Sequence, residues 1–154
     1  MVKRTTALVI VTLGVLFLSA CDSPNMNQGP VAIARSSNGF EIAVCSDIDA
    51  ASIQVFFRED AGTGRWETVW DAEGLVEIST GEILTATSVA ERFDTVSLLR
   101  TPALGPASGI EVLILSAASS TKNVTATFDL RDSTDDSSKW IHPDGSSSDE
   151  PCRN

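Results

Sequence analysis

The sequence predicts an all-β fold: a single antiparallel β-sandwich of about eight strands with an extended C-terminal tail. Short apolar or alternating runs recur from residue 31 onward, and turn residues such as Gly, Pro, Asn and Ser separate them. Val, Ile, Thr and Ser are frequent, and long stretches rich in helix-forming residues are missing. The 134 residues that follow residue 20 in this 154-residue chain suit one domain with a sizeable core.

The first half of the domain predicts strands over residues 31–35, 40–45, 53–58 and 65–71, with weaker strands over 75–79 and 82–87. Phe40, Ile42 and Val44 fall on one face of the second strand, which directs Cys45 away from the main core face. Gly62-Thr63-Gly64 separates the third and fourth strands, as in a β-hairpin. Residues 88–91 fit a capping box, so one helical turn is expected there.

The second half predicts strands over residues 95–100, 110–116 and 124–130, with a loop rich in Pro and Gly over 101–109. Residues 110–116 are apolar on both faces apart from Glu111, which is typical of a central strand. Residues 131–139 are polar and acidic, so we expect a loop or mobile arm. Trp140 and Ile141 then give the tail an apolar foothold, which we expect to dock on the outer surface of the sandwich before a turn at His142-Pro143-Asp144-Gly145.

The N-terminal residues have the layout of a secretory signal peptide. Lys3 and Arg4 precede an apolar run over residues 7–17, and Leu18-Ser19-Ala20-Cys21 follows. The run is too short for a comfortable membrane span, which needs about 20 residues. A signal peptide cut without lipidation is the alternative, and it would leave Cys21 as an exposed free thiol.

The four residues Leu18-Ser19-Ala20-Cys21 resemble the lipobox of bacterial lipoproteins. The resemblance implies cleavage before Cys21, acyl chains such as palmitate on this residue, and a lipid-anchored position on the extracytoplasmic face of the cell membrane. It divides the chain into a signal peptide (1–20), an anchor and tether (21–30), the sandwich (31–130) and a tail that folds back (131–154). Two acyl chains are enough for stable membrane binding.

Charge excludes one class of partner. Without residues 1–20 the chain keeps 9 basic and 21 acidic side chains, a net charge of −12. Nucleic acid is therefore excluded, because phosphate binding needs clustered Lys and Arg. Anionic headgroups should also repel this surface. The polar tether over residues 22–30 reaches at most about 30 Å, so the domain should stay near the membrane.

Cysteine usage predicts one disulfide. If Cys21 carries lipid, Cys45 and Cys152 remain as a pair in an oxidising compartment, and their bond would tie the tail to the sandwich. No two cysteines have the short C-x-x-C spacing of redox or zinc sites, so a structural bond is expected.

The strand pattern resembles immunoglobulin-like and fibronectin-III-like sandwiches. Three features depart from a true immunoglobulin domain: the third strand offers Phe56 and Phe57 where a Trp is typical, Tyr is absent, and the second Cys lies near the chain end. The resemblance therefore implies the architecture rather than the family in its strict sense, and a small barrel is the alternative.

Residues that could carry catalysis are few. His142 is the only His, and a serine or cysteine hydrolase usually needs a His base beside its nucleophile. Ser119-Ser120-Thr121-Lys122 matches S-x-x-K of penicillin-binding enzymes, but a hairpin turn explains it better. Asp132, Asp135 and Asp136 do not follow the spacing of a calcium loop. We therefore expect no catalytic residue, no metal and no cofactor.

Trp66 and Trp70 are the candidate ligand-binding residues. Residues four apart on a strand share a face, so both rings could form a platform that stacks on sugar rings. The competing interpretation, which we favour, places one or both rings in the core, where Trp is usually well buried.

The sequence thus favours a lipid-anchored, non-enzymatic surface module that binds a ligand or supports the envelope. One alternative is a module that binds cell-wall glycan through Trp66 and Trp70. Another is a small envelope hydrolase with paired carboxylates, for which four acids are candidates: Glu59, Glu67, Asp71 and Glu77. The sequence names neither a ligand nor a protein partner.

Overall fold

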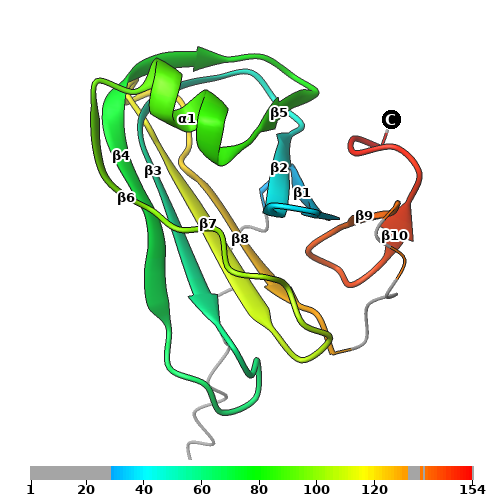
Figure 1. The fold of residues 1–154 in the computed structure, drawn as a ribbon. Coiled ribbons are helices and arrows are strands. Elements are labelled where there is room, and N and C mark those ends of the chain that lie inside the picture. The colour runs from blue at the N-terminus through cyan, green and yellow to red at the C-terminus, as the bar shows by residue number, and fades with distance from the viewer. Residues whose placement is uncertain (1–28, 132–135, 137, 154) are drawn as a thin grey trace, which may run out of the picture.

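In the part of the chain that the structure describes, two five-stranded antiparallel sheets and one short helix form the fold (Figure 1). The computed structural model describes residues 29–131, 136 and 138–153, so Cys21 and the signal peptide lie outside it. Sheet A has the strand order β6-β4-β3-β7-β8, and sheet B has the order β10-β9-β1-β2-β5. The predicted all-β sandwich is confirmed. Within the described residues no helix has the length and apolar character needed to cross a membrane.

The strands of sheet A are β3 (Ile48–Arg58), β4 (Glu67–Ile78), β6 (Thr95–Leu99), β7 (Gly109–Ser116) and β8 (Val124–Asp129). Those of sheet B are β1 (Val31–Ser36), β2 (Gly39–Val44), β5 (Glu82–Leu84), β9 (Trp140–Ile141) and β10 (Ser147–Ser148). The orders β1-β2-β5 and β3-β7-β8 follow the A-B-E and C-F-G orders of an immunoglobulin sandwich. The edges of the two sheets differ from that fold. In sheet B, β9 and β10 extend the sheet beyond β1. In sheet A, β6, which follows β5 in the chain, lies at the edge beside β4.

The core fills the space between the sheets with alternate residues of each strand. Ile53 and Val55 of β3 face Ile33 and Ile42 of sheet B, and all four side chains are fully buried. Burial of one such side chain stabilises the fold by about 1.5–3 kcal/mol. The predicted central strand is confirmed, since β7 lies between β3 and β8.

Strand β4 is one long strand where the sequence predicted two. It continues through Gly74, whose φ of +149° favours glycine, and a Cβ there would lie 2.6 Å from the backbone nitrogen of Asp94. A second irregularity lies at Val69, because Val55 pairs with Trp70 while Phe56 pairs with Thr68. The extra residue is a β-bulge, which reverses the alternation of faces along the strand.

Helix α1 (Ala86–Arg92) begins before the predicted helical turn. Thr85 is the N-cap: its hydroxyl accepts from the backbone N–H of Ser88, whose own hydroxyl accepts from the Thr85 N–H. The N-cap therefore lies three residues before the one predicted for a capping box at residues 88–91, so that prediction was wrong. Strand β5 ends at Leu84 and is shorter than the strand predicted over residues 82–87. The buried side chains of Val89 and Phe93 join the core from this helix.

The tail folds back, but not onto the outer surface of the sandwich as predicted. Strand β9 pairs with β1 and β10 pairs with β9, so the tail adds a hairpin to the edge of sheet B. Ile141 is buried in the core, and Trp140 is half-buried. Two-residue strands give too little alternation to be predicted from sequence.

The connections gather at two ends of the sandwich. The tether pole, where the described chain begins, comprises residues 29–30, 45–47, 79–81, 117–123 and 142–146. The distal pole comprises residues 36–39, 59–66, 100–108 and 129–131. Backbone hydrogen bonds hold each pole together, such as Cys45 N–H to the Pro30 carbonyl (2.6 Å) at one and Ala61 N–H to the Ala107 carbonyl (2.6 Å) at the other.

Candidate functional site

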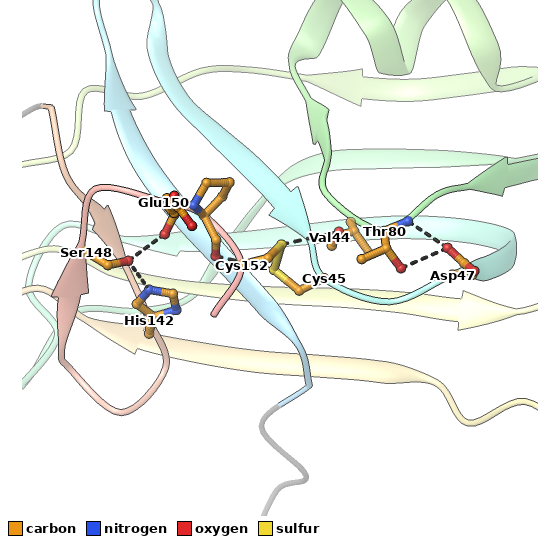
Figure 2. The surroundings of a disulfide bond; sticks show 9 residues. Val44, Cys45, Asp47, Thr80, His142, Ser148, Glu150 and Cys152 are labelled. Atoms are coloured by element: carbon orange, nitrogen blue, oxygen red, sulfur yellow. Dashed lines mark hydrogen bonds between the residues drawn. A yellow bond between two sulfur atoms is a disulfide. The ribbon is translucent and has the colours of Figure 1, made fainter. Parts of the chain in front are cut away.

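A disulfide closes the tether pole. The bond joins Cys45, which follows β2, to Cys152 in the tail, and their Cα atoms lie 5.3 Å apart (Figure 2). The structure thus contains the predicted pair. Cys45 also contacts the entering chain, because its N–H donates to Pro30. The bond therefore fastens the start of the domain, the end of β2 and the tail to one another.

The β9–β10 hairpin is held by polar side chains next to this bond. Nε2 of His142 lies 2.6 Å from Oγ of Ser148, whose hydroxyl donates to the Glu150 carbonyl (Figure 2). Burial, and then the positive charge of Arg153, lower the pKa of His142 below its usual 6.5, although Asp144 opposes them. The single His of the chain therefore acts as a largely neutral hydrogen-bonding group within a hairpin.

The distal pole packs three loops against one another. A Cβ on Gly39, in the β1–β2 turn, would lie 2.7 Å from Cβ of Thr101, and Nε of Arg35 donates to the Leu104 carbonyl. Two open hollows, about 610 and 440 Å³, lie on either side of the 100–108 loop. Concave, partly apolar surfaces of this kind are where ligands and partners usually bind.

An ion pair borders the distal pole at the end of β8. Arg131 donates to the carboxylate of Asp129. This contact lowers the pKa of Asp129 from 3.8 to about 2. Asp60 across the pole also has a lowered pKa, because it accepts from the backbone N–H of Gly62 and the hydroxyl of Thr63. These carboxylates remain ionised at neutral pH and order the loops that carry them.

The structure does not form the alternative platform of Trp66 and Trp70, and the interpretation that at least one ring lies in the core is confirmed for Trp70. Trp70 is fully buried and stacks on Phe40 with ring centroids 4.8 Å apart. Trp66 is half-buried on the outer face of sheet A, where the guanidinium of Arg58 lies 4.3 Å from its ring centroid. The bulge at Val69 explains this outcome, because one extra residue sends the two rings to opposite faces.

Trp66 and Arg58 lie over a glycine. Arg58 pairs with Gly109 of β7, and a Cβ on Gly109 would lie 2.7 Å from Nε of Arg58 and 3.3 Å from the Trp66 ring. The missing side chain leaves room for both residues to lie flat across the strands. Nε of Arg58 has no hydrogen-bond partner within the described residues. Sequence analysis missed Arg58, and the only available signal was its outward position on the third strand.

The residues considered for catalysis are dispersed. Ser119-Ser120-Thr121-Lys122 lies in the predicted turn between β7 and β8, with every residue exposed. Among the candidate carboxylates, Glu67 pairs with Arg100, and Asp71 accepts from Gln54. Glu59 lies in a distal loop, whereas Glu77 lies at the opposite end of β4.

The described residues contain no group of three or more His, Cys, Asp or Glu side chains arranged to hold a metal ion. Asp132 and Asp135, considered for calcium, lie outside the described residues. Asp136 accepts from the backbone N–H and hydroxyl of Ser138, which lowers its pKa. This bonding pattern is that of a turn-forming Asp.

The chain matches no known protein family, no curated protein and no solved structure.

Proposed function

We propose that this chain is an exported lipoprotein, anchored through Cys21, whose sandwich serves as a non-enzymatic binding module on the extracytoplasmic face of the membrane. The observation that carries the proposal is the division of the domain into two poles. The described chain enters at Gly29, beside the disulfide, while the hollows next to the 100–108 loop lie at the other end. A tether from Cys21 would therefore leave the distal pole facing away from the membrane.

The cysteines support export and lipidation together. The chain has three cysteines, and the Cys45–Cys152 bond accounts for two of them. Structural disulfides persist in oxidising compartments outside the cytoplasm. The remaining cysteine follows the apolar N-terminal run at the position where a lipoprotein carries its acyl chains.

The polar contacts support a binding role rather than catalysis. His142 contacts Ser148 inside a hairpin, but the Ser148 hydroxyl donates to the Glu150 carbonyl and not to the imidazole, so the pair lacks the hydrogen bond of a nucleophile to its base. Asp60 and Asp129 have lowered pKa values, the opposite of what a general acid at neutral pH requires. Binding modules, by contrast, commonly present loops and sheet faces on a rigid scaffold.

Metabolic labelling with palmitate tests the anchor. The full chain should incorporate label and sediment with membranes, whereas Cys21→Ser should lose the label and appear in the soluble extract. The C45S/C152S double variant is the matched control, because it removes the other two cysteines and should stay labelled. Label retained by Cys21→Ser, or lost equally from the control, would reject lipidation at Cys21.

A further inference from the structure

The outer face of sheet A carries large apolar side chains where a solvent-facing sheet is normally polar. Phe56 of β3 points outward, because Val55 is fully buried and Phe57 packs against the core. Leu113 points outward between two fully buried neighbours on β7, and Leu115 follows with 36% of its surface exposed. Trp66 lies on the same face.

These four side chains form a continuous band, which we call the apolar stripe (Trp66, Phe56, Leu113 and Leu115). Phe56 pairs with Thr68 on β4 and with Glu111 on β7. Leu113 is therefore its diagonal neighbour, at a separation that aromatic and long side chains can bridge. The stripe runs from Trp66, the residue before β4, through Phe56 of β3 to the end of β7.

Within the described residues, neither the helix nor the tail covers the stripe. Helix α1 sends Val89 and Phe93 into the core between the sheets. The tail hairpin extends sheet B instead, through the pairing of β9 with β1. Uncovered apolar surface on a sheet is a common feature of protein-binding sites.

The charge around the stripe selects the partner. Six acidic residues of sheet A share the outward alternation of the stripe, against one basic residue, Arg58: Asp49, Asp71, Glu73, Glu77, Glu111 and Asp129. Of these six, Asp129 already pairs with Arg131. Arg58 is already engaged with the ring of Trp66, whereas Glu111 lies directly beside Phe56. A second copy of the chain would bring acidic face against acidic face in a symmetric contact, which costs energy.

We infer that the outer face of sheet A docks a cationic protein surface, whose apolar side chains cover the stripe while its Lys and Arg meet the surrounding carboxylates. The inference rests on the proposed binding role, but not on the lipid anchor. Trp is enriched among the residues that dominate binding energy, so Trp66 is the expected centre of the contact.

Trp66 supplies the readout. The full chain carrying Trp140→Phe is placed in phosphatidylcholine nanodiscs, so that Trp66 and the fully buried Trp70 are the remaining indoles. Three synthetic peptides are titrated: one alternating Lys and Leu, one alternating Glu and Leu, and one alternating Lys and Ser. We expect a saturable shift of Trp66 emission with the Lys/Leu peptide alone, because only this peptide combines both chemistries.

Matched variants locate the contact. Leu113→Thr should raise the dissociation constant for the Lys/Leu peptide at least tenfold, and Ile83→Thr should change it less than twofold. Ile83 is a suitable control because it is 43% exposed on β5 of the other sheet. Glu111→Gln should weaken binding about threefold at low salt, whereas Glu91→Gln on α1 should not. If Leu113→Thr does not fold cooperatively, Leu115→Thr replaces it.

Four results would overturn the inference: equal binding of the Glu/Leu peptide, no effect of the stripe variants, an equal loss in the Ile83 control, or no binding by any peptide. Sedimentation velocity adds a fifth result. If the protein is a dimer and Leu113→Thr makes it a monomer, a second copy of the chain occupies the stripe and the inference is wrong. Loss of the lipid anchor alone would keep the protein out of nanodiscs. The same titration in buffer would still test the stripe, so the two proposals fail separately.

Discussion

Removal of the Cys45–Cys152 bond should destabilise the protein more than any surface substitution. The two cysteines are separated by 107 positions, so the bond closes most of the domain into one loop. Closing this loop lowers the conformational entropy of the unfolded chain. The corresponding gain in the free energy of unfolding is about 5 kcal/mol at 25 °C. Domains of this size are stable by only about 5–15 kcal/mol, so the bond supplies a large fraction of the total.

Urea unfolding of the full chain and of the C45S/C152S double variant measures this contribution. With an m-value of about 2 kcal/mol/M, the unfolding midpoint should fall by about 2–3 M urea. Wild-type protein reduced with dithiothreitol should unfold at the midpoint of the double variant, which controls for the substitutions themselves. Hydrogen exchange should also show β9 losing protection before the rest of sheet B, because β9 pairs with β1 over two residues only. A midpoint shift smaller than about 0.5 M, with cooperative unfolding in both proteins, would refute the loop-closure reasoning.

Further predictions concern the core, the helix, a turn and the tail. Trp70→Phe should cost less than about 1.5 kcal/mol in urea unfolding, because the buried Nε1–H of Trp70 has no acceptor within the described residues and its removal offsets part of the lost packing; a cost above about 3 kcal/mol would contradict this. Thr85→Ala should cost about 1 kcal/mol through loss of the N-cap, while the exposed Thr87→Ala should cost far less, and equal losses would refute the assignment of the cap. Gly39→Ala should lower the melting temperature, because φ is +117° and the new Cβ would meet Thr101, so an unchanged melting temperature would argue against this turn. The lowered pKa of His142 means that the unfolded chain binds more protons below about pH 6.5, so stability should fall from pH 7.5 to 5 in calorimetry, and less steeply in His142→Asn; identical pH profiles would show that His142 is not responsible.

Residue patterns predicted the interior of the sandwich well, because alternation is a direct consequence of burial on one face. The runs at residues 31–35, 40–45 and 110–116 became β1, β2 and β7, and Phe40, Ile42 and Val44 point into the core as expected. The disulfide was also predictable, since three cysteines with one in a sequence that resembles a lipobox leave a single pair.

The site was less predictable, because it depends on one-residue irregularities and on pairing between distant segments. The bulge at Val69 has no clear sequence signal, yet it decides which Trp is buried. The apolar stripe required the register of β3 with β7, which places Leu113 diagonally from Phe56. The tail strands depend on contacts with β1, which follow from tertiary packing rather than local propensity.

The meeting of both described chain ends at one pole has a practical consequence for labelling. The Cys45–Cys152 bond and the contact of Cys45 with Pro30 keep residues 29 and 152 near each other. Under the proposed anchoring, a fluorophore carried near Cys152 would therefore report on the bilayer surface. A fluorophore inserted at Gly62-Thr63-Gly64 would sample the space furthest from the lipid. Energy transfer from each fluorophore to an acceptor in the bilayer would therefore report the tilt of the domain.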